Sequence, residues 1–374
     1  MVSGRHLRVL SGILPALWLL CLCLRHGATA PVEADCPCTD PSQCELITTP
    51  PRKELFAFVV EDSNWQKYDW SKITTVGMFI KYDPKLMCHA HSKGARIVLA
   101  VVYPAANLTN PAARTAWIQQ QVAQAKSWHM DGVNFDIEYE VSTEHAHYVV
   151  DLVKETAQAF KAYNPNAQIT FDIAGVPDCF LLGRCYDYTA LAEACDFLFL
   201  MDYDFLAAGP VALPNSPLSV IKFGVDLLKV VYGVPSSKMV LGVPWYGYDC
   251  PCVELLPDDV CLVNRTLTLS KPGVGSGSVT QIQYKDIMKL LPKSSTGRLF
   301  SELFQSPYFN YKDASGQTHE LWYDDPASLA LRYDYARAED LRGVGMFEAD
   351  SLDYSNDPLA MNQTKAMWDA IDKF

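Results

Sequence analysis

Residues 131 to 140 read Asp-Gly-Val-Asn-Phe-Asp-Ile-Glu-Tyr-Glu, and this stretch decides the fold. In a β-strand, alternate side chains point to opposite faces. One face is apolar and carries Val133, Phe135 and Ile137. The other face is polar and carries Asn134, Asp136 and Glu138. Helical patterns precede and follow the stretch, which favours a parallel strand buried on both faces.

A polar row on a buried strand requires an explanation. Two carboxyl groups and an amide are costly to bury unless they are paired or used. The alternative is a half-exposed antiparallel strand with a wet polar face, which the flanking helical patterns disfavour. We therefore interpret the stretch as an active-site strand.

The start of the chain is typical of a targeting segment. A basic beginning is followed by an apolar run at residues 13–24, which is too short to span a bilayer, and by small residues suited to cleavage at 28–30. We expect a signal peptide at residues 1–30 and a mature domain at residues 31–374. The later sequence contains no apolar run of about eighteen residues, so we expect no membrane span.

A secretory route has consequences for asparagine and cysteine residues. Three sequons become usable as glycosylation sites and should lie on the surface: Asn107, Asn264 and Asn362. Twelve cysteines minus the two in the first thirty residues leave ten, for which disulfides are the default. Cys179 and Cys185 are expected to bridge a short loop. The cysteine spacings do not match zinc motifs, so we expect no metal and no cofactor.

Charge and composition limit the possible partners. The net charge of −12 argues against nucleic acid or an anionic membrane as a partner, and it is compatible with an acidic compartment. A chain that is 49% hydrophobic over 374 residues is long enough for one large domain or two ordinary ones.

Strand and helix patterns alternate along the chain. Eight runs read as strands, at 55–60, 73–80, 96–102, 131–138, 169–174, 196–201, 239–244 and 344–347. Six stretches read as helices, at 111–128, 143–163, 217–232, 283–291, 327–341 and 357–371. This alternation predicts an α/β fold, a closed (β/α)₈ TIM barrel. A doubly wound open sheet is the alternative, but no phosphate-binding turn follows the first strand.

The region at about 248–323 interrupts the alternation after the seventh strand. It holds three cysteines and a sequon, and it reads as a loop-rich insertion with a hairpin at 309–323.

The strand ends predict the chemistry, because barrel active sites lie at the carboxyl ends of the strands. Apart from Met201, these positions are acidic or aromatic, and they include no histidine: Tyr103, Asp136, Glu138, Asp172, Met201, Asp202, Tyr203, Asp204, Trp245, Tyr246, Glu348 and Asp350. Such a set excludes serine–histidine and metal–histidine schemes. Carboxyl groups beside aromatic rings suit a sugar substrate.

Several motifs resemble those of family-18 glycoside hydrolases, the chitinase and chitobiase group. Residues 131–138 resemble the fourth-strand signature Asp-Gly-x-Asp-x-Asp-x-Glu, with Asn134 in place of one aspartate. Residues 201–204 match Met-x-Tyr-Asp of the sixth strand, and 242–247 resemble the seventh. The run from 322 to 353 resembles the approach to the eighth strand, so the likeness covers nearly the whole mature chain.

Two departures from the chitinase pattern narrow the choice of group within the family. Glu348 stands where chitinases usually carry a tryptophan, and residues 100–103 replace their third-strand Ser-x-Gly-Gly. The resemblance is closest to the lysosomal chitobiase group, which cleaves the N,N′-diacetylchitobiose core of asparagine-linked glycans and releases the reducing-end N-acetylglucosamine. It therefore implies a lysosomal enzyme, which we expect to be a monomer, with an N-acetylglucosamine-containing oligosaccharide as substrate.

The resemblance also implies residue roles. Glu138 would be the general acid and should be desolvated beside Asp136, so that it keeps its proton. The nucleophile would be the substrate's own 2-acetamido oxygen, with Asp136 orienting the acetamide N–H and Tyr203 bonding its oxygen. Other residues are expected to line the substrate pocket: Asn134, Met201, Asp204, Trp245 and Glu348.

Three questions stay open at this stage. Asn134 is either a substrate contact or a satisfied buried amide, and Asp204 is either a substrate contact or a structural partner of the row. A chitinase acting on long polymers and a sugar-binding lectin on the same barrel are the alternative functions.

Overall fold

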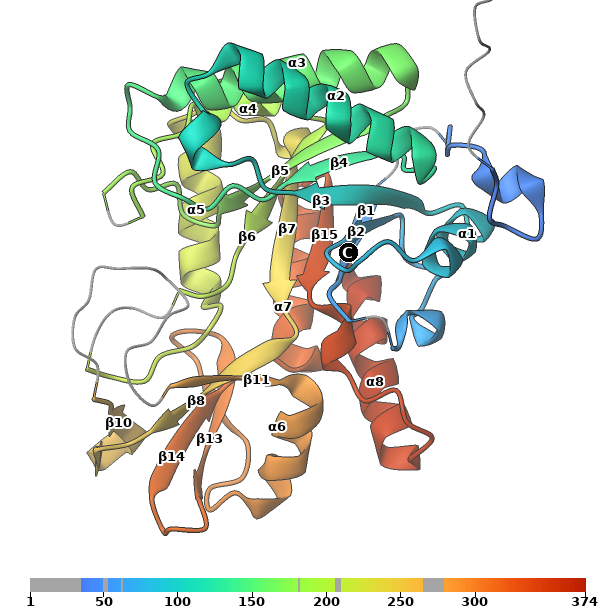
Figure 1. The fold of residues 1–374 in the computed structure, drawn as a ribbon. Coiled ribbons are helices and arrows are strands. Elements are labelled where there is room, and N and C mark those ends of the chain that lie inside the picture. The colour runs from blue at the N-terminus through green and yellow to red at the C-terminus, as the bar shows by residue number, and fades with distance from the viewer. Residues whose placement is uncertain (1–34, 50–52, 62, 181, 206–209, 265–278) are drawn as a thin grey trace, which may run out of the picture. The chain divides into compact units, whose positions relative to one another are not determined.

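Eight parallel strands close into a barrel in the computed structural model, which describes residues 35–49, 53–61, 63–180, 182–205, 210–264 and 279–374 (Figure 1). Around the barrel the order is β1-β15-β7-β6-β5-β4-β3-β2. The strands are β1 (Glu54–Val59), β2 (Thr75–Met78), β3 (Arg96–Val101), β4 (Gly132–Phe135), β5 (Gln168–Ala174), β6 (Phe197–Met201), β7 (Met239–Pro244) and β15 (Gly343–Phe347). The predicted TIM barrel is confirmed, and the open-sheet alternative is excluded. The predicted signal peptide lies outside the described residues.

Phenylalanine rings fill the inside of the barrel. The buried inner cluster consists of Phe56, Phe58, Val98, Phe197, Phe199 and Val240. Glycines on neighbouring strands make room for these rings: a Cβ at Gly242 would lie 2.3 Å from the Phe199 ring, and one at Gly345 would lie 2.6 Å from it. The interior is therefore a packed core, so polar chemistry is confined to the strand ends.

Helices cover the outside of the barrel, and α2 and α3 lie side by side there (Figure 1). Their bounds are α1 (Pro84–Ser92), α2 (Pro111–Ser127), α3 (Ala146–Tyr163), α4 (Tyr188–Ala194), α5 (Leu218–Val230), α7 (Pro326–Ala338) and α8 (Pro358–Ala370). Asp83, Asn110, Asp325 and Asp357 each cap a helix and precede a proline at its first position. This combination satisfies free N–H groups and presets the first turn. Within the described ranges, no helix combines the length and apolar character needed to cross a membrane.

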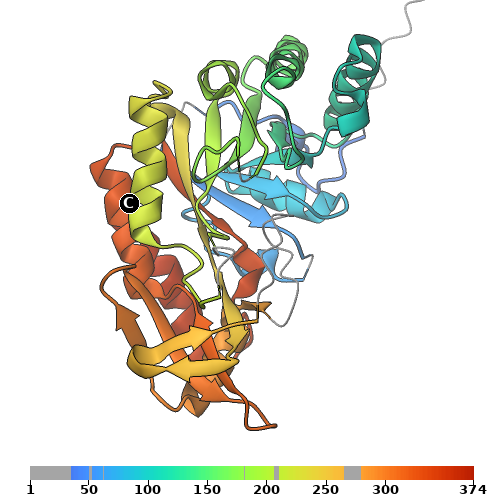
Figure 2. The same cartoon turned by 90° about the vertical axis from the view of Figure 1, so that its left-hand side faces the viewer.

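The chain between β7 and α7 forms a second, antiparallel sheet in the order β11-β8-β14-β13-β12 (Figure 2). Its strands are β8 (Tyr246–Pro251), β11 (Thr280–Gln283), β12 (Leu299–Ser301), β13 (Ser306–Lys312) and β14 (Thr318–Trp322). Helix α6 (Tyr284–Leu290) and the pair β9 (Glu254–Leu256) and β10 (Val260–Leu262) complete it. The predicted hairpin is β13 and β14. The described part is more regular than the loop-rich insertion that the sequence suggested.

Short 3-10 helices connect several of these elements. They are η1 (Pro41–Cys44), η2 (Trp65–Lys67), η3 (Ala105–Asn107), η4 (Ser236–Lys238), η5 (Pro257–Asp259), η6 (Leu291–Lys293), η7 (Ala349–Ser351) and η8 (Ile371–Lys373).

Four disulfides bridge the described chain: Cys36–Cys44, Cys38–Cys88, Cys179–Cys185 and Cys252–Cys261. The predicted Cys179–Cys185 bridge is therefore confirmed. The sulfurs of Cys36, Cys38 and Cys44 lie close together because two disulfides meet there. Sulfurs bonded in this way offer no thiolate to a metal.

Candidate active site

The first two residues of the signature are structural. The Asp131 carboxylate accepts the backbone N–H groups of Ile47 at 2.7 Å and Ile97 at 2.8 Å, and it lies 2.9 Å from Nε2 of His91. A Cβ on Gly132 would lie 1.9 Å from the carbonyl oxygen of Gln168, so only glycine fits against β5. These contacts fix the start of β4 and hence the direction of the residues that follow.

The rest of the signature alternates as predicted. Val133, Phe135 and Ile137 are fully buried in the layer shared with the helices. On the opposite face, exposure increases along the chain: Asn134 is buried, Asp136 is partly buried, and 52% of the Glu138 side chain is exposed. The polar row therefore runs from the barrel interior to the solvent at its mouth.

Asn134 is bonded to the neighbouring strand. Its Nδ2 donates to both carboxylate oxygens of Asp172, at 2.8 Å each, while its own Oδ1 has no hydrogen-bond partner among the described residues. Burial raises the pKa of Asp172 well above its usual range, and the charge of Asp136 adds to the rise. The Asn134 amide opposes it by stabilising the carboxylate. The amide nitrogen of Asn134 therefore fits the alternative of a satisfied buried amide. Its oxygen, which lacks a partner among the described residues, does not.

Asp136 is the row member with a pKa near neutrality. Burial and, to a lesser extent, the charge of Glu138 raise the pKa of Asp136 to about 7 against the opposing effect of Arg184. Asp136 therefore takes up a proton when the solution becomes mildly acidic.

The prediction that Glu138 is desolvated is wrong. Its carboxylate is half exposed and forms an ion pair with Arg184, whose Nη2 lies 2.6 Å from Oε2. The reason is geometric: β4 ends at Phe135, so Glu138 lies beyond the packed end of the strand. Desolvation instead acts on Asp136 and Asp172.

Tyr203 follows β6 and faces the same row. Its ring stacks on Phe347 of β15 with centroids 5.8 Å apart. Burial raises the pKa of its phenol well above the ordinary value, and Asp172, Asp204, Asp136 and Glu138 add to the rise. Tyr203 is therefore a neutral O–H donor in the electrostatic field of the row. The structure brings Glu138, Asp136 and Tyr203 to one mouth.

Asp204 has a structural role. Its Oδ1 accepts hydrogen bonds from the hydroxyls of Tyr246 at 2.6 Å and Tyr248 at 2.7 Å. Its backbone N–H donates to Oδ1 of Asn215 at 2.7 Å. These bonds tie the end of β6 to β8, and a substrate contact by Asp204 stays a prediction. Met201, at the end of β6, packs against the phenylalanine cluster.

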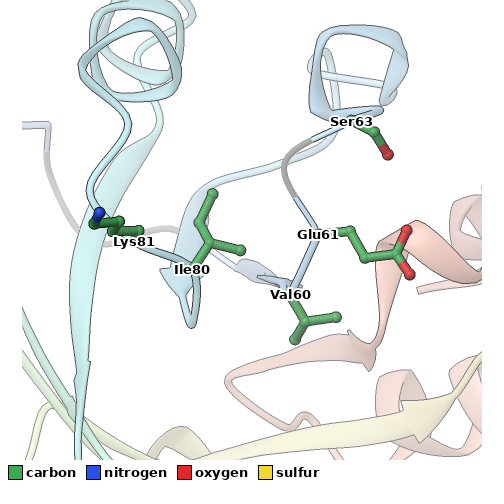
Figure 3. A pocket seen from close by; sticks show the side chains of 5 residues that line it. All are labelled: Val60, Glu61, Ser63, Ile80 and Lys81. Atoms are coloured by element: carbon green, nitrogen blue, oxygen red, sulfur yellow. The ribbon is translucent and has the colours of Figure 1, made fainter.

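Glu348 lies at the opposite side of the mouth, directly after β15. Its Oε1 accepts from Nε2 of Gln283 at 2.9 Å, and the same Nε2 lies 3.4 Å from Glu61. Glu61 lines a pocket of about 490 Å³ with Val60, Ser63, Ile80 and Lys81 (Figure 3). This pocket opens at the carboxyl ends of β1 and β2, on the face that carries the row. The Asp136–Glu138 pair, after β4, is not part of its lining.

Comparison with known proteins agrees with this geometry. Residues 56–351 match glycosyl hydrolases family 18. The chain is 43% identical over 364 residues to di-N-acetylchitobiase of Mus musculus, covering 96% of this chain and 98% of the relative. The chain belongs to family 18. It is a glycoside hydrolase.

Two further comparisons extend this result. The human di-N-acetylchitobiase is 42% identical over 343 residues, covering 90% of this chain and 88% of the relative. A class V chitinase from Nicotiana tobaccum in complex with NAG4 superposes with a TM-score of 0.68 at 18% identity, covering 84% of this chain and 99% of that one. The latter likeness shows that the barrel is the family-18 fold.

Trp245 does not lie in the family-18 sugar site, which corrects the prediction. Its ring is fully buried and packs edge-on against Trp368 of α8, with centroids 4.9 Å apart. It belongs to the layer between barrel and helices. Alternation along β7 places Trp245 on the same outward face as Leu241 and Val243, which lie in the same layer.

The predicted glycosylation sites differ in exposure. Asn264 and Asn362 are exposed, whereas Asn107 at the end of η3 is half-buried. Whether these positions carry glycans stays a prediction.

Arg184 is the residue of this family-18 site that sequence reasoning missed. It contacts Glu138 although 46 residues separate the two. One signal was available: Arg184 directly precedes Cys185 in a loop predicted to close at the end of the fifth strand, near the mouth.

Proposed function

We propose that this family-18 enzyme cleaves the β-1,4 bond of N,N′-diacetylchitobiose cores of asparagine-linked oligosaccharides. The products would be the reducing-end N-acetylglucosamine and a fragment whose newly created reducing end retains the β configuration. The observation that carries the proposal is the intact Asp136–Glu138 pair beside Tyr203, in a chain that is similar to di-N-acetylchitobiases over nearly its full length.

The proposed reaction uses the substrate as its own nucleophile. Glu138, at the exposed end of the row, is placed to reach a glycosidic oxygen and protonate the leaving sugar. The 2-acetamido oxygen then attacks the anomeric carbon and forms an oxazolinium ion. Tyr203 would hydrogen-bond the acetamide oxygen, and Asp136 would accept its N–H. Glu138 finally removes a proton from water, which opens the ring and gives retention.

Proton sharing within the row follows from the charges. The charge of Glu138 contributes to the raised pKa of Asp136, so the two carboxyl groups are electrostatically coupled. Below about pH 7 Asp136 holds a proton in the free enzyme. The developing positive charge on the acetamide favours an ionised Asp136, so that proton can be released toward Glu138, which must be protonated when the bond breaks.

A lysosomal site of action is part of the proposal. The acidic medium of that compartment would keep one proton on the Asp136–Glu138 pair. It would also suit a chain with a net charge of −12.

Product analysis tests the function. The wild type and Glu138→Gln are incubated at pH 5 with a free glycan core that has an intact reducing end. We expect release of N-acetylglucosamine by the wild type and at least about a 1000-fold lower rate for the variant. Faster cleavage of long chitin polymer than of the core would support a chitinase. Binding of sugar without turnover would support a lectin.

A further inference from the structure

A second segment is fastened to the chain that carries Glu138. The backbone N–H of Val141 donates to the carbonyl of Gly183 at 2.8 Å, and that of Cys185 donates to Val141 at 2.9 Å. The Tyr186 hydroxyl donates to the carbonyl of Ile137 at 2.5 Å. Residues 183–186 and 137–141 are therefore held as one unit on the mouth of the barrel.

Arg184 lies in the middle of this unit and is directed at Glu138. Its Nη2 lies 2.6 Å from Oε2 of Glu138, and its Nε donates to the Glu138 carbonyl at 3.1 Å. Only 8% of the Arg184 side chain is exposed, compared with 52% for Glu138. The Cys179–Cys185 disulfide closes the loop directly beside it. A buried guanidinium bonded to both the main chain and the carboxylate of one residue fixes the direction of that side chain.

We propose that Arg184 is a positioning residue for the proton donor: it aims the Glu138 carboxyl at the leaving oxygen and sets the charge balance of the Asp136–Glu138 pair. This inference rests on the proposed function, because it assigns Glu138 the role of proton donor.

The charged and titratable groups around the pair determine the sign of the effect. From β4 and its extension come Asp136 and Glu138, and from β5 comes Asp172. From the end of β6 come Tyr203 and Asp204, and from the disulfide loop come Arg184 and Tyr186. The carboxylates favour protonation of one another, and Arg184 opposes this by lowering the pKa of Asp136. Removal of the guanidinium therefore makes the pair hold its proton to higher pH.

Two variants separate position from charge. Arg184→Gln loses the positive charge and the two-point bonding of the guanidinium. We therefore expect the alkaline limb of the plot of kcat/KM against pH to move to higher pH by about half a unit to one unit. We also expect kcat at the optimum pH to fall about tenfold, with KM changed less than about threefold, because the Glu138 carboxyl is no longer aligned with the leaving oxygen. Arg184→Lys keeps the charge, so its alkaline limb should stay near that of the wild type while kcat still falls.

Arg114→Gln is the matched control. Arg114 is buried to the same degree and forms a two-point ion pair with Glu155, at 2.9 and 2.7 Å, between α2 and α3. The Arg114→Gln variant should lose about as much stability as Arg184→Gln and leave the pH profile of kcat/KM unchanged.

A titration without turnover keeps the proposal separate from the function. In protein with ¹³C-labelled aspartate carboxyls, the Asp136 resonance is assigned by its loss in Asp136→Asn. Its midpoint should rise in Arg184→Gln and not in Arg114→Gln. Unchanged midpoints together with an unchanged kcat would overturn the role of Arg184. If the wild type cleaves no chitobiose but the Asp136 midpoint rises in Arg184→Gln, the proposed function is wrong and the electrostatic coupling of Arg184 to Asp136 is supported.

Discussion

Asn134→Asp would restore the aspartate that the family signature usually has, and the structure predicts that this change is harmful at neutral pH. In the wild type, Nδ2 of Asn134 donates to both oxygens of Asp172 at 2.8 Å. The variant replaces this donor with a carboxylate, so two buried acids face each other and compete for one proton.

The magnitude follows from the lost bonds. A hydrogen bond to a charged acceptor contributes about 1.5–3 kcal/mol, so we expect a loss of about 3 kcal/mol at pH 7.5. At pH 5 a proton shared between the acids restores one bond, and the loss falls to about 1 kcal/mol. The native variant holds that proton while unfolded aspartates release theirs near pH 4, so its stability decreases as pH rises through this range.

Thermal unfolding at pH 5 and pH 7.5 is the assay. For a domain of this length, 1 kcal/mol corresponds to roughly 1–2 °C, so Tm should fall about 4 °C at pH 7.5 and about 1–2 °C at pH 5. Asn310→Asp is the control, because Asn310 is also buried and donates to an aspartate, Asp259, at 3.1 Å in the second sheet. It should lose stability without altering the pH profile of activity. A Tm decrease in Asn134→Asp that is the same at both pH values would show that the two acids do not share a proton.

Two further substitutions test other parts of the molecule. Tyr203→Phe removes the hydroxyl proposed to hold the acetamide oxygen, so kcat should fall about 10–100-fold with folding unchanged; steady-state kinetics and circular dichroism would check this, and a wild-type kcat would exclude the role. Glu320→Gln removes a buried carboxyl that accepts from Trp322 at 2.6 Å and whose pKa burial raises to about 8. The native protein holds this proton and the unfolded chain does not, so from pH 5 to pH 8 the wild type should lose about 2–4 kcal/mol of stability relative to the variant. Urea unfolding at both pH values measures the difference, and parallel stability curves would contradict a raised pKa.

The barrel was predictable because its strands are continuous apolar runs separated by strong helical patterns. Helices α1 and α4 were missed since they are only nine and seven residues long. Apart from the predicted hairpin of β13 and β14, the second sheet was missed for a different reason. Strands such as Tyr246–Pro251 mix tyrosine, glycine, aspartate and cysteine, and their pairing is set by contacts distant in sequence.

The site was predictable where alternation along one strand determines direction. Asn134, Asp136 and Glu138 lie on one face because a strand has a period of two. Solvent exposure was not predictable in this way: Glu138 lies past the end of β4, and the loop that covers it comes from the following β/α unit. Trp245 was misplaced because its position at the end of β7 was weighed above the alternation, which puts it on the outer face with Leu241 and Val243.

The central claim is that Glu138 supplies the proton for cleavage assisted by the substrate's own acetamido group. The most direct measurement is the anomeric form of the newly created reducing end, the C1 that carried the cleaved bond, recorded by ¹H NMR during turnover of a diacetylchitobiose core by the wild type and by Glu138→Gln. We expect the β-anomer from the wild type and no detectable product from the variant. Release of the α-anomer, or a variant that turns over as fast as the wild type, would contradict this claim.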